Sequence, residues 1–168
     1  MTLAKFARLC ESIEFVTPTK KTQLISQALS GFGDNKSLVI KTLALEYEAN
    51  NIGTARAKTW ISNALGIFEE ELDNALYTWG ELGESIAQMD EGNETDSDIT
   101  MLAFASLLTL NCSRAESEAY RIFSENVNKM SAREKKWFIR YWVRKPRNGV
   151  NNKVPLKAMK LYFTDDKI

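Results

Sequence analysis

The sequence predicts an all-α fold, a single compact multi-helix domain over residues 1–168, and three observations support this prediction. Apolar residues recur at spacings of three and four along most of the chain, as they do on one face of a helix. Residues that start helices, such as Thr17 before Pro18, precede several of these segments. No segment shows the convincing apolar–polar alternation that is typical of strands. We therefore expect about eight to ten helices.

The first half of the chain contains most of the predicted helices. The first is expected over Leu3–Ile13, where apolar residues at helical spacing form one face. Thr17 is a helix cap and Pro18 suits the first helical position. A turn at Asn50–Gly53 interrupts the pattern later. By the apolar spacing, the further helices of this half lie over residues 18–29, 38–45, 57–65 and 68–82, the last broken near Gly80 and Gly83.

The second half begins after a charged loop over Asp90–Asp98, which we expect to be solvated and to divide the domain into two halves. This loop lacks the spacing and the closing Glu of a calcium loop, so no metal site is predicted there. An apolar helix is expected over Ile99–Leu110. Two S-x-x-E capping boxes, Ser113 with Glu116 and Ser131 with Glu134, then introduce two helices. The second of these is expected over 135–145, followed by a turn over 145–149 and, after Asn151 or Asn152 as cap, a last helix to Phe163.

Composition excludes several classes of protein. The absence of histidine removes the commonest general base and metal ligand, and no glycine-rich phosphate loop is present. We therefore expect no enzyme, no cofactor and no small-molecule substrate. No apolar run is long enough to cross a membrane, and the first residues do not resemble a signal peptide. With Cys10 and Cys112 as buried free thiols, an intracellular protein is expected.

The charged residues are strongly segregated although the net charge is zero. Residues 66–98 contain eleven acidic residues and no Lys or Arg, whereas residues 129–160 contain eleven basic residues and one acid, Glu134. A neutral protein with this distribution can still present a basic face to phosphates. The acidic segment 66–98 is expected to point away from nucleic acid and is a possible surface for a protein partner.

The basic end predicts a surface that follows a phosphate backbone. Spacings of three and four place two sets of cations on common helical faces, on either side of the turn: Arg133, Lys136, Arg140 and Arg144, and Lys153, Lys157 and Lys160. In the turn, Arg147 can bind phosphate or enter a narrow minor groove, and Gly149 lets the backbone approach phosphate oxygens. The aromatic residues of WFIRYW are expected in the core, with Trp137 at the border of the basic stripe and a candidate for base stacking.

Four segments resemble, in order, parts of the N-terminal DNA-binding domain of ATP-dependent DNA ligases. The first two helices of that domain are similar to FARLCESIE and TPTKKTQLIS. Its short glycine turn and following apolar helix are similar to NIGTARAKTWISNAL, and its G-D-L-G-E segment to TWGELGESIAQM. Its closing helix, R-x-G-V turn and Ala-rich helix are similar to MSAREKKWFIRYWVRKPRNGVNNKVPLKAM. The resemblance covers nearly the whole chain.

The resemblance implies an all-helical domain that grips duplex DNA across the minor groove around a nick, mostly through phosphates. It implies contacts from three parts of this chain: Thr19, Lys20 and Lys21; Gly53, Arg56 and Lys58; and Arg144, Lys145, Arg147, Asn148, Gly149 and Lys153. Pro146 and Asn148 depart from the family's usual turn, in which a hydrophobic residue separates Arg from Gly. The K-x-D-G nucleophile motif of the ligase core occurs nowhere in the sequence.

These observations leave several functions open. The chain is either an excised ligase domain or a stand-alone binder of DNA or RNA, for example a viral one, and the start at Met1 without a tag favours the stand-alone protein. The alternative from another class is a protein-interaction adaptor whose basic C-terminal helices dock an acidic partner. It would be recognised by an exposed apolar patch beside the basic stripes. An enzyme with a Lys nucleophile is the least favoured, because no Lys lies in a recognisable carboxylate cluster.

Overall fold

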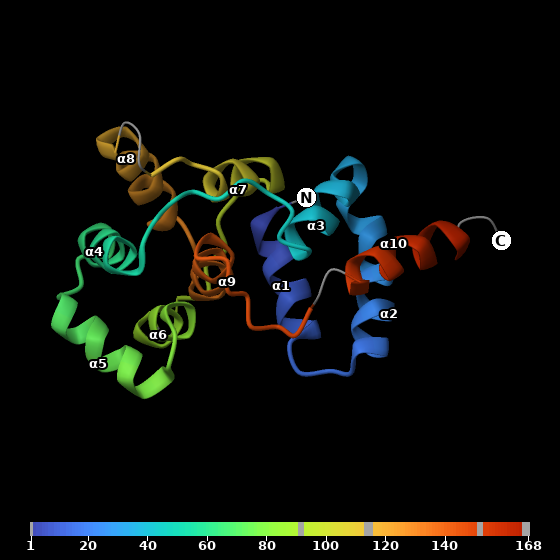
Figure 1. The fold of residues 1–168 in the computed structure, drawn as a ribbon, viewed down its shortest axis with the longest axis horizontal. Coiled ribbons are helices and arrows are strands. Elements are labelled where there is room, and N and C mark those ends of the chain that lie inside the picture. The colour runs from blue at the N-terminus through green and yellow to red at the C-terminus, as the bar shows by residue number, and fades with distance from the viewer. Residues whose placement is uncertain (1, 91–92, 113–115, 151–152, 166–168) are drawn as a thin grey trace.

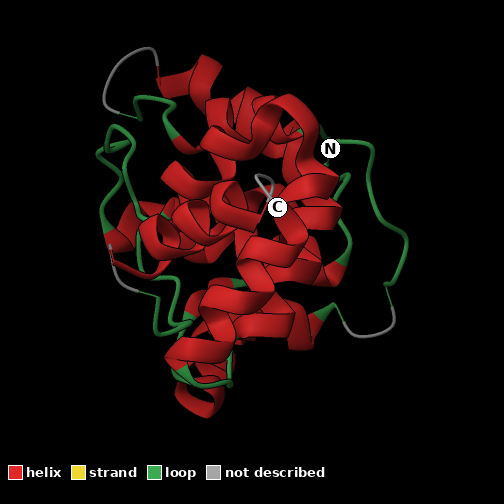
Figure 2. Ribbon diagram, turned by 90° about the vertical axis from the view of Figure 1, so that its right-hand side faces the viewer, coloured by secondary structure: helices red, strands yellow, loops and turns green. Residues whose placement is uncertain are grey.

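The protein is built from helices joined by loops, some short and some of about ten residues, such as the connection between α3 and α4 (Figures 1 and 2). The computed structural model describes residues 2–90, 93–112, 116–150 and 153–165. In chain order the helices of these residues are α1 (Leu3–Ile13), α2 (Pro18–Leu29), the 3-10 helix η1 (Ser30–Asn35), α3 (Lys36–Leu43), α4 (Thr54–Leu65), α5 (Glu69–Trp79), α6 (Leu82–Met89), α7 (Met101–Leu108), α8 (Glu116–Val127), α9 (Ala132–Trp142) and α10 (Lys153–Asp165). The described residues contain no strand, so the all-α prediction is confirmed.

Local signals in the sequence set most of the helix ends. The Thr17 side chain accepts a hydrogen bond from Lys20 N and caps α2, which has Pro18 at its start. Ser131 and Glu134 form the predicted capping box of α9. The predicted break of the segment 68–82 lies at Gly80, whose φ of 84° ends α5. Three other predicted caps, Ser113, Asn151 and Asn152, lie outside the described residues.

Gly83, the other predicted breaker, lies inside α6 and serves close packing instead. A Cβ atom at Gly83 would come within 2.7 Å of both the Lys136 carbonyl oxygen and Arg140 Cγ. Helices α6 and α9 therefore approach more closely than any residue with a side chain would allow at this position. This contact brings the acidic start of α6 against the basic helix α9.

Helix α9 runs through the centre of the molecule (Figure 1). It packs against α6 on one side and α1 on another, and also contacts α7. Helices α4, α5, α6 and α8 lie to the left of α9 in Figure 1, and α2, α3 and α10 lie to the right. Helix α10 packs against α2 and α3, so the end of the described chain returns to its first part. The connection from α9 to α10 crosses between the two sides.

One hydrophobic cluster joins both sides. At its centre the rings of Phe123 and Trp142 stack at 4.6 Å between centroids, and Phe138 lies 6.0 Å from Trp142. Trp137 is fully buried in the same cluster. The prediction that the aromatic residues of WFIRYW belong to the core is therefore confirmed. The suggestion that Trp137 could stack on bases is wrong, because its ring is covered by Lys136 and Arg140, at 5.2 and 4.7 Å from the ring centroid.

Both cysteines are free and fully buried, and we expect them to be unreactive in the native protein. Burial raises the pKa of the Cys10 thiol far above its usual range and also raises the pKa of Cys112. Because the thiolate is the reactive form, a disulfide-exchange reagent at about pH 8 should label neither thiol until the protein is unfolded. Denatured protein, the control, should give two thiols per chain. Rapid labelling of native protein would contradict this.

Candidate nucleic-acid interface

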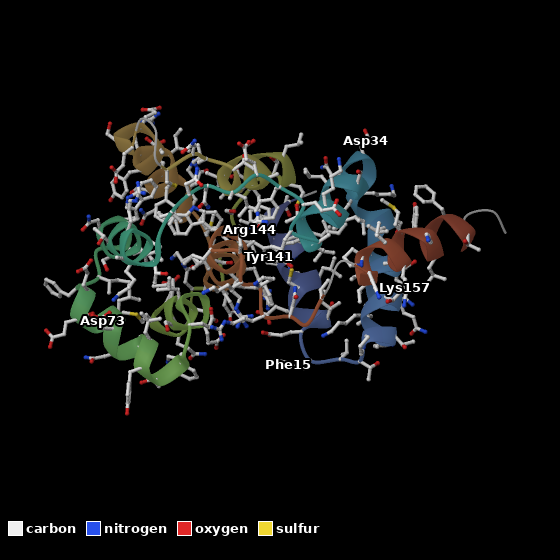
Figure 3. All side chains as sticks on the ribbon, viewed as in Figure 1. Phe15, Asp34, Asp73, Tyr141, Arg144 and Lys157 are labelled. Carbon is white, nitrogen blue, oxygen red and sulfur yellow. The ribbon has the colours of Figure 1, made fainter. Side chains whose placement is uncertain are left out.

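The turn between α9 and α10 adopts an unusual backbone that tertiary contacts hold in place. Arg144, Arg147 and Gly149 have positive φ angles of 61°, 54° and 68°. The first two are costly for residues with a side chain, so the surrounding structure must offset the strain. Arg144 supplies part of this support, because its guanidinium donates to Tyr47 O at 2.9 Å and Leu45 O at 3.0 Å and lies over the Tyr47 ring. Figure 3 shows Arg144 near the centre of the molecule, beside Tyr141.

Asn148 fixes the second half of this turn from inside. Its side chain is buried, donates to the Tyr141 hydroxyl at 2.8 Å and accepts from Val150 N at 3.1 Å. The backbone carbonyl oxygen of Asn148 accepts a hydrogen bond from Lys21 Nζ at 2.7 Å. Asn148 therefore belongs to the support of the turn, and its side chain does not face solvent.

The supported turn leaves two cations facing solvent. Lys145 and Arg147 are exposed, with the buried Pro146 between them. Both line a cleft of about 230 Å³ that is also lined by Gly53 and Thr54 at the start of α4. The Gly80–Leu82 segment completes this cleft. The glycine turn at Gly53 and the R-x-G-V turn at Arg147 are two of the segments that resemble the ligase domain. The fold brings them together although about 90 residues separate them in the sequence.

The start of α4 is suited to an anion. Gly53 is its N-cap and provides no side-chain hydrogen bond, so backbone N–H groups of the first turn have no capping side chain. A Cβ atom at Gly53 would meet nothing within 4 Å, so the approach to these groups is open. Positive helix ends of this kind attract phosphate, and Lys145 and Arg147 add full positive charges to the same cleft.

The start of α2 forms the second part of this surface. Thr19 and Lys20 are exposed in the first turn, and Thr19 lines a shallow cleft of about 280 Å³ with Lys157 of α10. Lys21 is buried and donates to Glu14 O at 3.3 Å as well as to Asn148 O. Its ammonium therefore joins the α1–α2 loop to the α9–α10 turn. We define the candidate interface as the exposed residues of these segments: Thr19, Lys20, Gly53, Thr54, Lys145, Arg147, Gly149 and Lys157.

The structure corrects the expectation of an exposed basic stripe along α9. Arg140 is buried, with Nη1 2.6 Å from Glu14 Oε2 and Nη2 2.9 Å from Glu81 Oε1. Lys136 is also mostly buried, and its Nζ lies 3.2 to 3.5 Å from carboxylate oxygens of Glu11, Glu14 and Glu84. Sequence spacing placed the cations on one face correctly, but that face packs against acidic residues of other helices. Of the predicted stripe on α9, Arg133 alone is exposed among the described residues, 3.9 Å from Glu11.

The other predicted contacts are divided between internal bonds and solvent. Arg56 Nη1 donates to Cys112 O at 2.6 Å, and Lys58 pairs with Asp73 at 2.5 Å, so both side chains already have partners. Lys160 is exposed on α10, one turn beyond Lys157. Lys153 is exposed at the start of this helix and has a partner within the chain.

The acidic segment 66–98 is partly neutralised by α9. Glu81 caps α6 through the N–H groups of Gly83 and Glu84 and pairs with Arg140. Burial raises the pKa of Glu84, but hydrogen bonds from Gln88 and Lys136 and nearby positive charge outweigh this effect and lower it. The loop after α6 is bound as well, since Ser97 donates to the Glu134 carboxylate through N and Oγ at 2.7 and 2.6 Å. This loop is therefore anchored to α9. Its described residues over 90–98 are exposed or half-buried, as expected of a solvated loop.

Neither a membrane-spanning helix nor a group of metal-binding side chains occurs in the part of the chain that the structure describes. None of the described helices combines the length and the apolar character that crossing a membrane requires. Within the described ranges, no three His, Cys, Asp or Glu side chains are grouped so that they could share a metal ion.

Comparison with protein families agrees with the four segments noted in the sequence. The family model described as DNA ligase N terminus matches residues 2–160. The chain belongs to this family. No curated protein matches the chain at a significant level. The match is to the ligase N-terminal domain alone, with no adenylation core found. Membership of the DNA ligase N-terminal family implies a DNA-binding role.

Sequence reasoning missed two kinds of residue in this ligase N-terminal domain. Thr54, at the start of α4, lines the same cleft as Lys145 and Arg147, and its place directly after Gly53 could have indicated a helix N-terminus. Glu14 and Glu81, the partners of Arg140, gave no local signal. They lie 126 and 59 residues from Arg140 in the chain, so only the packing of α1 and α6 against α9 shows the pairing.

Proposed function

We propose that this chain binds duplex DNA without catalysing a reaction, mainly through phosphate contacts from the candidate interface. The observation that carries the proposal is the cleft in which Lys145 and Arg147 face the uncapped start of α4. Two cations and a helix N-terminus at one cleft are suited to bind phosphate oxygens. Lys20 and Lys157 extend the positive surface at the start of α2 and on α10.

The rigid support of the turn favours binding over solubility as the role of these cations. Lys145 and Arg147 sit on a strained backbone that Arg144 and Lys21 hold by three hydrogen bonds with distant segments. The Asn148 side chain adds two local hydrogen bonds, with Tyr141 and Val150. Strained turns of this kind persist where their geometry is used. A charge required for solubility alone needs no fixed backbone. Preorganised cations also lose less conformational freedom when they bind phosphate.

The strength of binding is expected to depend steeply on salt. Four exposed cations lie in the interface: Lys20, Lys145, Arg147 and Lys157. If each neutralises one phosphate, counterion release predicts an affinity loss on the order of a hundredfold between about 50 and about 200 mM salt. The neutral net charge of the chain predicts moderate affinity overall, because long-range attraction to DNA is weak.

The test is fluorescence anisotropy of the chain with nicked duplex DNA, intact duplex DNA, single-stranded DNA and single-stranded RNA, each at both salt concentrations. We expect duplex DNA to bind more tightly than either single strand, with the salt dependence given above. Preference for RNA or single strands would mean that the fold serves a different nucleic acid. The absence of salt-dependent binding to all four would contradict nucleic-acid binding and favour the protein adaptor.

A further inference from the structure

Phe15, in the loop between α1 and α2, is an exposed aromatic residue with 91% of its surface accessible. Single exposed apolar residues are common on proteins and mean little by themselves. Phe15 differs from an ordinary surface residue in its support and its neighbours. It lies at the lower edge of the molecule in Figure 3, on the loop that leads to the start of α2.

The backbone on both sides of Phe15 is fixed. The carboxylate of Glu14, the preceding residue, is buried and bound by Arg140 at 2.6 Å, and its carbonyl oxygen accepts from Lys21 Nζ. Two residues after Phe15, Thr17 caps α2. An exposed ring on a fixed backbone can enter a partner with a small loss of conformational freedom, since only its side-chain torsions become ordered.

The neighbours of Phe15 are the cations of the candidate interface. Because Lys21 Nζ donates to both Glu14 O and Asn148 O, the residue before Phe15 is held against the turn that contains Arg147 and Gly149. Lys20 is exposed in the first turn of α2, on the other side of the loop. The ring of Phe15 therefore projects from a loop with phosphate-binding candidates on both sides.

We propose that Phe15 inserts into the minor groove of bound duplex DNA and partly separates one base step. This inference rests on the proposed function and adds a role that phosphate contacts cannot supply. Apolar side chains that enter the minor groove act as wedges between base pairs and bend the duplex, while neighbouring cations hold the phosphates. A nick favours the same insertion, because a base step that lacks one backbone linkage opens at a lower cost.

Two other strongly exposed aromatic residues, Phe68 and Tyr77, provide a contrast. Phe68 and Tyr77 are 76% and 94% exposed at α5, but the whole segment 66–98 contains no Lys or Arg. A ring there would meet the DNA backbone beside acidic side chains, which repel phosphate. Phe68 is therefore a matched control: it is the same residue type, is similarly exposed, and lies outside the interface.

The experiment uses the full chain with duplexes of about 20 base pairs that carry 2-aminopurine, whose fluorescence rises when it is unstacked, at a different position in each duplex. We expect the chain to raise the fluorescence at one or two adjacent positions. Phe15→Ala should abolish this rise and weaken duplex binding by about fivefold or more, while the salt slope of binding stays unchanged. Phe15→Leu should keep part of the rise, because Leu also acts as a wedge, and Phe68→Ala should keep all of it.

Anisotropy on the same duplexes separates this inference from the proposed function. If the chain binds duplex DNA but the fluorescence does not rise, or rises equally with Phe15→Ala, the wedge is wrong and phosphate binding stands. If no duplex binds at all, the proposed function fails, and the wedge fails with it. Circular dichroism of Phe15→Ala should match the parent chain, since removal of a side chain that is 91% exposed leaves no cavity.

Discussion

Replacing Arg140 by Ala is expected to destabilise the protein by about 3 kcal/mol, because the substitution leaves buried carboxylates without their partner. Arg140 contacts Glu14 and Glu81, and the side chains of all three residues are at most 10% exposed. Its guanidinium joins α1 and the start of α6 to the central helix α9. Lys136 lies 3.5 Å from Glu14 and offsets part of the loss, so the effect should fall near the lower end for a broken buried pair.

The measurement for Arg140 is urea unfolding followed by tryptophan fluorescence. Arg140→Lys should be intermediate, because one ammonium cannot reproduce the forked contacts of a guanidinium with two carboxylates. Arg133→Ala is the matched control on the same helix, since Arg133 is about half exposed and lies 3.9 Å from Glu11. It should change the free energy of unfolding by less than about 0.5 kcal/mol. Equal effects of the two Ala substitutions would show that the buried network does not stabilise the fold.

The double substitution of Lys145 and Arg147 by Ala should give the largest loss of DNA binding. Both side chains are exposed and line the cleft at the start of α4, so their removal should leave the fold intact. We expect the affinity for duplex DNA to fall on the order of tenfold for each lost phosphate contact. The slope of log affinity against log salt should become shallower by about 2, since each contact contributes about 0.9.

Arg144 is unsuitable for this test, although its place in the sequence suggests a phosphate contact. Its guanidinium holds Tyr47 O and Leu45 O, so Arg144→Ala would disturb the turn that carries the other cations. The matched control is the double substitution of Lys41 and Lys129, two exposed lysines outside the interface. It removes the same net charge and should leave the salt slope nearly unchanged. A similar slope change in both double variants would mean that binding reflects total charge and not this surface.

Much of the fold could be predicted from the sequence, because helix formation depends on local patterns. The cap at Thr17, the capping box at Ser131 and the break at Gly80 each need only residues within one turn of the chain. The burial of the aromatic residues in α9 also followed from their spacing. The predicted boundaries were less accurate: the helix expected over 135–145 extends over Ala132–Trp142. The last residues of that prediction instead form the turn with the positive φ at Arg144.

The candidate site could be predicted only in part. Arg147 and Gly149 were identified from the basic turn and Lys145 from the family resemblance, and the structure places all three at the surface. Gly53 was suggested by family resemblance alone, and the structure places it in the same cleft as Lys145 and Arg147 of this turn. Lys21 and Asn148 were expected to contact nucleic acid, but both are buried and bonded to each other. Whether any of these residues touches DNA stays a prediction that the experiments above decide.

The sequence by itself determined the helical class, several helix starts and the separation of acidic from basic segments, since these depend on residue order and on contacts within a few residues. Only the tertiary structure decided which cations remain available. Lys136 and Arg140 share a helical face with Arg133, but α1 and α6 bring carboxylates against that face and bury them. The free energy of a buried charge depends on partners from distant parts of the chain, so a helical wheel cannot distinguish a cation that binds a ligand from one that holds the fold together.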